Sequence, residues 1–101
     1  MAKTKSEVIA DIKAYIQEWG GKYSDWYVGI ASDAKSRLFN DHAVKEKGGD
    51  GWIFRECENS TIARDIEDYF INTLGTDGGP GGGDYTTKSV YAYKKTSYTK
   101  E

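Results

Sequence analysis

The chain has 101 residues and a net charge of −2, with three Trp, eight Tyr and three Phe. This length suits one domain with a single modest core, and so many aromatic residues exclude a disordered chain. The acidic balance argues against a protein that holds nucleic acid by bulk electrostatics, because such binding depends on neutralising phosphates. It leaves room for an enzyme that contacts DNA through a local basic patch.

The chain has one cysteine and one histidine, Cys57 and His42. No intrachain disulfide can form and a zinc site built from several cysteines is excluded, so any metal ion would be a hard cation held by oxygen atoms. No apolar run approaches the length of a membrane span, and the N-terminus MAKTKSEV lacks the apolar region of a signal peptide. We therefore expect a cytoplasmic protein that does not insert into a membrane.

The first expected element is a helix within TKSEVIADIKAYIQEWGG, residues 4–21. Thr4 and Glu7 have the spacing of a capping box, and the two glycines end the helix. Apolar residues recur at helical spacing along it and predict one core-facing stripe, which comprises Val8, Ile9, Ile12, Tyr15, Ile16 and Trp19.

A short strand follows at Trp26–Ala31, and alternation places Tyr27 and Gly29 together on one of its faces. The polar residues after it predict the start of a second helix, over residues 33–44. The stretch KEKGGDG, residues 45–51, is expected to be a loop.

The second half of the chain predicts one more strand, helix and strand. WIFRECE (52–58) is the strand, and TIARDIEDYFINTL (61–74) is a helix that Asn59 or Ser60 caps and Gly75 ends. The glycine-rich run 75–84 is a loop without the pattern of a phosphate-binding loop. The strand SVYAYKK places Tyr91 and Tyr93 on one face, and residues 95–101 form a polar tail. The order αβαβαβ predicts a single α+β domain over residues 1–101.

Glu67 is unusual because it falls at the edge of the apolar arc of the third helix, when about 100° is counted per residue. A carboxylate beside the core is costly unless it is paired, protonated or bound to a metal ion. The structural alternative is an edge glutamate that pairs with an arginine or reaches solvent. Taken alone, Arg37, His42 and Tyr27 also have ordinary structural explanations, as a surface group, a helix-end residue and sheet packing.

The order of these residues resembles that of the GIY-YIG nuclease domain over residues 26–76. YVG on a strand is followed by Arg37 on the next helix, eight residues after Gly29, and then by His42. Glu67 comes later, within ARDIEDYFINTLGT on another helix. The resemblance implies a small, mainly antiparallel three-stranded sheet flanked by three helices, which agrees with the element order.

The function that the resemblance implies is Mg²⁺-assisted hydrolysis of DNA phosphodiester bonds. Tyr27 would lie beside the attacking water or act in general-base chemistry, and Arg37 would bind the scissile phosphate. His42 would orient a nucleophile or assist the tyrosine. Glu67 would hold the Mg²⁺ ion, and Gly29 would be structural at the site.

The leading GIY strand of the family is missing, because its expected position falls at AYI, residues 14–16, inside the first helix. Two segments are candidates to replace it. KYSD would be a degenerate strand that supplies Tyr23, whereas SVYAY would pair beside WYVGI and supply Tyr91 or Tyr93.

His42 follows Arg37 by five residues, where the family has four, and this spacing separates the two by about 140° on an α-helix. Either the helix bulges or ends near Asn40, or His42 lies outside the site. Asp41 stands at the four-residue spacing and would place an anion beside the phosphate. The glycine-rich run also replaces an asparagine that the family has after the glutamate helix.

The sequence leaves three hypotheses. The first is a small Mg²⁺-dependent DNA endonuclease, and the second is a catalytically inactive module of the same fold, carried by a phage or mobile element, that binds protein or nucleic acid. The third is a structural α+β domain without a site. The first requires Arg37 and Glu67 to reach one cleft with Tyr27 and His42, and placement of Arg37 and Glu67 on opposite sides of the sheet would exclude it.

Overall fold

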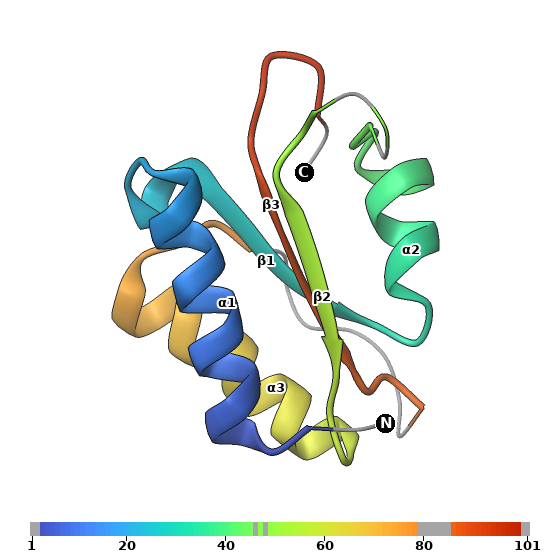
Figure 1. The fold of residues 1–101 in the computed structure, drawn as a ribbon. Helices are drawn as coiled ribbons and strands as arrows, with labels where there is room; N and C mark the ends of the chain where they lie inside the picture. Colours follow the sequence, from blue (N-terminus) through green and yellow to red (C-terminus); the bar gives the residue numbers. More distant parts are fainter. Residues whose placement is uncertain (1–2, 46, 48, 79–85, 100–101) are drawn as a thin grey trace.

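The computed structural model describes residues 3–45, 47, 49–78 and 86–99. It confirms an α+β fold with three helices and a three-stranded antiparallel sheet (Figure 1). The strands are β1 (Trp26–Ala31), β2 (Trp52–Glu56) and β3 (Ser89–Lys94), in the spatial order β1-β3-β2. The last strand of the chain is thus central and pairs antiparallel with both of the others. Pairing of SVYAY beside WYVGI, one of the two alternatives for the missing strand, is confirmed.

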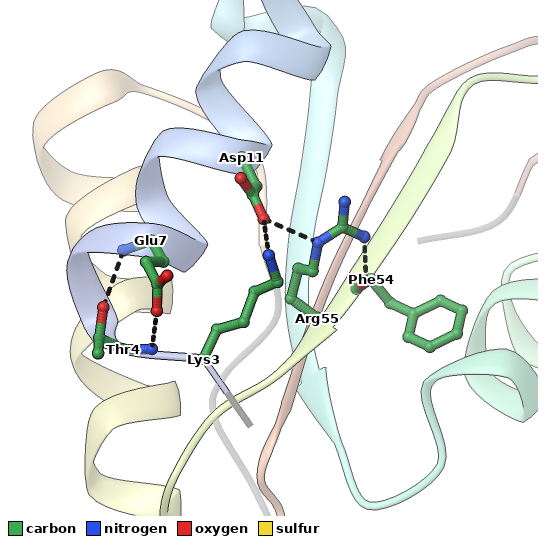
Figure 2. Close-up of polar contacts among 6 residues, drawn as sticks. All are labelled: Lys3, Thr4, Glu7, Asp11, Phe54 and Arg55. Carbon is green, nitrogen blue, oxygen red and sulfur yellow. Dashed lines mark hydrogen bonds and ion pairs between the residues drawn. The ribbon is translucent and has the colours of Figure 1, made fainter. Parts of the chain in front are cut away.

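Helix α1 (Lys5–Trp19) starts at the predicted capping box and is tied to β2 (Figure 2). Thr4 Oγ1 accepts a hydrogen bond from the backbone N–H of Glu7 at 3.2 Å, and the Glu7 carboxylate accepts one from the N–H of Thr4 at 2.9 Å. One turn further along, Asp11 accepts a hydrogen bond from Arg55 Nε at 2.9 Å and pairs with Lys3 Nζ at 3.1 Å. These bonds satisfy the first N–H groups of the helix and hold α1 beside the edge strand.

One face of the sheet packs on α1 and α3 (Ser60–Asp68), as Figure 1 shows. Asn59 caps α3, and its side chain accepts a hydrogen bond from Ile62 N at 2.9 Å. The helix continues as the π-helix η3 (Tyr69–Leu74) and ends at Gly75, whose φ is 88°. The buried residues of this core are Val8, Ile12, Ile16, Trp26, Val28, Ile30, Ile53, Cys57, Ala63, Ile66, Phe70, Val90 and Ala92.

Trp19 does not belong to this core, so its predicted place in the α1 stripe is wrong. Trp19 is 42 % exposed as the last residue of α1, where its ring lies near that of Tyr15 and close to Gly51. The chain leaves the helix there through Gly20, at a φ of 90° that glycine adopts without strain.

The second helix lies on the opposite face and is shorter than predicted. Asp33 caps α2 (Ala34–Ser36), which runs directly into the π-helix η2 (Arg37–Asp41). The expected continuation to Val44 is wrong, because the backbone turns at Ala43, which has a φ of 60°, and Val44 N donates to Leu38 O at 3.0 Å. The buried residues of this smaller core are Tyr27, Ala31, Ala34, Leu38, Val44, Tyr91 and Tyr93.

The segment KYSD is not a strand. Residues Tyr23–Asp25 form the 3₁₀-helix η1, in which the Asp25 carboxylate accepts a hydrogen bond from Lys22 N at 3.0 Å. Tyr23 packs against the core formed by α1 and α3. The proposal that Tyr23 replaces the missing tyrosine of the site is therefore wrong.

The start of the predicted glycine-rich loop runs along the outer edge of β1. Val28 N donates to Asp77 O, and Asp77 N donates to Trp26 O, both at 2.9 Å. Residues 79–85 of that loop and the tail residues 100–101 lie outside the described residues. No helix in the described part of the chain is long and apolar enough to cross a membrane.

Candidate active site

Three tyrosines gather on the α2 face of the sheet because β1 and β3 pair in a single register. Tyr91 lies opposite Gly29, and Tyr93 lies opposite Tyr27. The rings of Tyr27 and Tyr93 stack with centroids 5.2 Å apart, and those of Tyr27 and Tyr91 stack at 6.3 Å. All three are buried, with exposed fractions of 6 % for Tyr27, 1 % for Tyr91 and 0 % for Tyr93.

Gly29 is required by space rather than by backbone conformation. A Cβ atom at this position would lie 2.5 Å from Tyr91 Oη, and no real side chain tolerates that distance. The absence of a side chain therefore lets the ring of Tyr91 lie directly on β1.

His42 joins the tyrosines because the second helix is π-helical at this point. His42 N donates to Arg37 O at 2.9 Å, so the five-residue spacing spans one hydrogen-bonded turn. The imidazole is 3 % exposed, with Nε2 at 2.7 Å from Tyr91 Oη and Nδ1 at 3.1 Å from Tyr93 Oη. Of the alternatives left open by the sequence, a bulged helix that carries His42 to the tyrosines is the one observed.

Arg37 is the exposed member of the group. Its side chain is 49 % exposed, and Nε lies 3.3 Å from the carboxylate of Asp41, the anion that the sequence places four residues later. Burial is the main factor that raises the pKa of Tyr91 above the usual tyrosine value, and Tyr27 adds to it. The positive charge of Arg37 opposes this rise, so the guanidinium acts on the hydroxyl of Tyr91.

Glu67 is deeper in the protein than its edge position in the helix predicted, since the residue is only 5 % exposed. Burial raises its pKa to about 7; the charge of Asp68 raises it further and that of Arg64 lowers it. Its carboxylate makes no hydrogen bond or ion pair within the described part of the chain. The structural alternative of a glutamate paired with an arginine is not what the structure shows.

The helices that carry Arg37 and Glu67 lie on opposite faces of the sheet (Figure 1). The placement of these helices counts against the endonuclease, which requires the two residues to reach one cleft. The charge of Glu67 nevertheless raises the pKa of Tyr91, while that of Arg37 lowers it. No hydrogen bond or ion pair joins Glu67 to Arg37 or Tyr91 among the described residues, so the two charges meet only through their influence on this pKa.

The side chains of the candidate site suit a Mg²⁺ ion only if the protein supplies few of the ligands of that ion. No group of three or more His, Cys, Asp or Glu side chains is placed to hold a metal ion among the described residues. Mg²⁺ often keeps several waters and binds through one or two carboxylates together with substrate phosphates. The buried carboxylate of Glu67 suits that role, whereas the described residues form no cage of protein ligands.

A separate surface hollow of about 460 Å³ lies between α1 and η3, lined by α1 residues such as Ile9 and Ala14 and by Tyr69. None of the predicted site residues lines it.

The sequence offered Tyr91 only as one of two alternatives. No local signal singles it out, because its position depends on the pairing of strands about 60 residues apart. No protein-family model, no curated protein and no solved structure matches this chain.

Proposed function

We propose that the protein is a metal-dependent endonuclease that hydrolyses DNA phosphodiester bonds, as the resemblance to GIY-YIG nucleases implies. One observation supports this most directly: the hydroxyl of Tyr91 lies 2.7 Å from His42 Nε2, and the positive charge of Arg37 lowers the pKa of Tyr91 while the charge of Glu67 raises it. Phosphodiester hydrolysis needs a group that takes a proton from water, a cation for the phosphate and a ligand for a metal ion. This group of residues contains one of each.

Tyr91 and His42 supply the proton acceptor. Because burial keeps Tyr91 neutral, we assign it a shuttling role, in which it takes a proton from the attacking water as its own proton passes to His42 Nε2. Tyr27, which the resemblance places beside the attacking water or in general-base chemistry, stacks on Tyr91 and Tyr93.

Arg37 is the residue that meets the substrate first, since it is the exposed member of the group. Its planar guanidinium matches the oxygens of a phosphate and favours the negative charge that develops there. Glu67 would hold the metal ion, which when bound polarises the phosphate and stabilises the leaving oxygen. DNA contact is expected to be brief, because the chain carries a net charge of −2.

The second candidate, an inactive module that binds protein or nucleic acid, is favoured by two other observations. Asp41 pairs with Arg37 at 3.3 Å and competes with a phosphate for the guanidinium. Tyr91 is only 1 % exposed, so a substrate water has to reach a hydroxyl that side chains cover.

Nicking of supercoiled plasmid in the presence and absence of Mg²⁺ distinguishes these functions. Arg37→Ala and Glu67→Ala should each lower the Mg²⁺-dependent rate by about 100-fold or more, because each removes a charge that acts on the reacting groups. Arg55→Ala is the matched control, since Arg55 lies on the other face and pairs with Asp11. Equal nicking by all four proteins would indicate a contaminating nuclease and refute the proposal, and no nicking by the folded wild type would favour the binding module.

A further inference from the structure

The contact between His42 and Tyr93 has no part in the function proposed above. Both ring nitrogens of His42 face a phenol oxygen, Nε2 that of Tyr91 at 2.7 Å and Nδ1 that of Tyr93 at 3.1 Å. His42 and both tyrosines are at most 3 % exposed. A neutral imidazole has one donor and one acceptor nitrogen, so the two contacts must run in one direction along the chain Tyr91–His42–Tyr93.

Two features of the structure set that direction. The contact of 2.7 Å has the length of a hydrogen bond donated by a hydroxyl, whereas 3.1 Å is nearer to one donated by an N–H group. Arg37 also acts on Tyr91 as a positive charge, which turns the lone pairs of that oxygen toward the guanidinium and its proton away. The geometry points to a hydrogen bond donated by Tyr91 to Nε2 and one donated by Nδ1–H to Tyr93.

We infer that Tyr93 is a positioning residue, which accepts a hydrogen bond from Nδ1–H of His42 and so holds the ring in the tautomer whose Nε2 can accept the proton of Tyr91. The arrangement follows the general logic of an activated hydroxyl, a base and a third group that orients the base. The consequence for catalysis rests on the proposed function, whereas the assignment of the tautomer does not.

The proton transfer that this tautomer permits is balanced. As the attacking water loses a proton to Tyr91 Oη, the O–H bond of Tyr91 breaks and an Nε2–H bond forms on His42. One proton has then left the water and one has been gained by the imidazole, which becomes an imidazolium. Its Nδ1–H remains hydrogen-bonded to Tyr93, and the proton on Nε2 returns to solvent at the end of the cycle.

Because the sequence contains a single histidine, ¹⁵N NMR of the imidazole reports on His42 alone. At neutral pH and without Mg²⁺ or DNA, we expect Nδ1 protonated and Nε2 unprotonated. Tyr93→Phe removes only the hydroxyl and should move the ring toward the Nε2–H tautomer, since the contact of Nδ1 with the Tyr93 oxygen is lost. Tyr23→Phe makes the same chemical change on the other face of the sheet and should leave the imidazole spectrum unchanged.

Steady-state kinetics on the same proteins test the consequence for the reaction. Tyr93→Phe should lower kcat by about 10-fold or more with KM changed less than about twofold, since the loss affects proton transfer and not substrate binding. Thermal melts of both variants serve as the check that they are folded.

Each result has a definite meaning. An Nε2–H tautomer in the wild type would overturn the inference without any variant, as would an unchanged imidazole spectrum and an unchanged kcat in Tyr93→Phe. A wild type that nicks no DNA but shows the Nδ1–H tautomer, lost in Tyr93→Phe, would support the role of Tyr93 in orienting His42 while it refutes the nuclease function.

Discussion

The substitution Glu67→Gln should stabilise the protein at neutral and alkaline pH. Glu67 is only 5 % exposed, and this burial raises the pKa of its carboxyl group from an ordinary value of 4.5 to about 7 in the folded protein. Between these two pH values the folded state holds a proton on Glu67 and the unfolded state does not, so the stability of the wild type falls as pH rises through this window. At about 1.4 kcal/mol for each pKa unit, the total loss is about 3 kcal/mol, complete above pH 7.

Glutamine does not titrate, so the variant should lack this loss. Below about pH 4.5 the two proteins should have equal stability, because Glu67 is then protonated in both the folded and the unfolded wild type. From pH 4.5 to 7 the variant should gain progressively on the wild type and reach an advantage of about 3 kcal/mol. Asp65→Asn, which removes an exposed carboxylate on the same helix, is the control and should change stability by less than about 0.5 kcal/mol.

Urea denaturation at a series of pH values from 4 to 9 measures this difference. A constant difference between wild type and Glu67→Gln over the whole range would refute the reasoning, because it would mean that the carboxylate is not desolvated. Addition of Mg²⁺ at ten times its dissociation constant should then stabilise the wild type by about 1.4 kcal/mol and leave the variant unchanged. Equal stabilisation of both proteins would show that Glu67 is not the metal ligand.

Two further predictions concern the neighbours of Tyr91 and Arg37. Gly29→Ala should destabilise the protein by about 1–3 kcal/mol in urea denaturation. The Cβ of the alanine would lie 2.5 Å from Tyr91 Oη and force the buried ring to move. An unchanged urea midpoint would mean that residues 29 and 91 do not touch. Asp41→Asn should alter the free energy of unfolding by less than about 0.5 kcal/mol. It should tighten DNA binding at low salt, because it removes the ion pair between Asp41 and the guanidinium of Arg37. Weaker DNA binding would contradict a phosphate-binding role for Arg37.

Much of the candidate site follows from the sequence, with particular exceptions. Tyr27, His42 and both tyrosines expected from the last strand, Tyr91 and Tyr93, do come together, and the charges of Arg37 and Glu67 shift the pKa of Tyr91. Tyr23 fails because its segment closes a turn through Asp25 instead of extending into a strand. The helical period also fails beyond Tyr69, where the π-helix η3 changes the number of residues per turn. Thr73, which a regular period places in the apolar arc, is exposed for this reason.

The sequence by itself determined where α1 and α3 begin and which faces the side chains of the strands occupy. The capping box at Thr4 and Glu7 and the cap at Asn59 depend on hydrogen bonds between residues three apart, and the alternation in β1 and β3 depends on geometry within each strand. Such interactions are local, so they can be read from adjacent residues.

Only the tertiary structure decided which residues meet at Tyr91. The insertion of β3 between β1 and β2 joins segments about 60 and 40 residues apart, and it alone places Tyr91 on Gly29. The π-helical turn that carries His42 inward is closed by packing against the two tyrosines and by the backbone turn at Ala43, which no local preference favours. These arrangements depend on the summed packing of distant segments, and for that reason the spacing of Arg37 and His42 remained ambiguous until the fold resolved it.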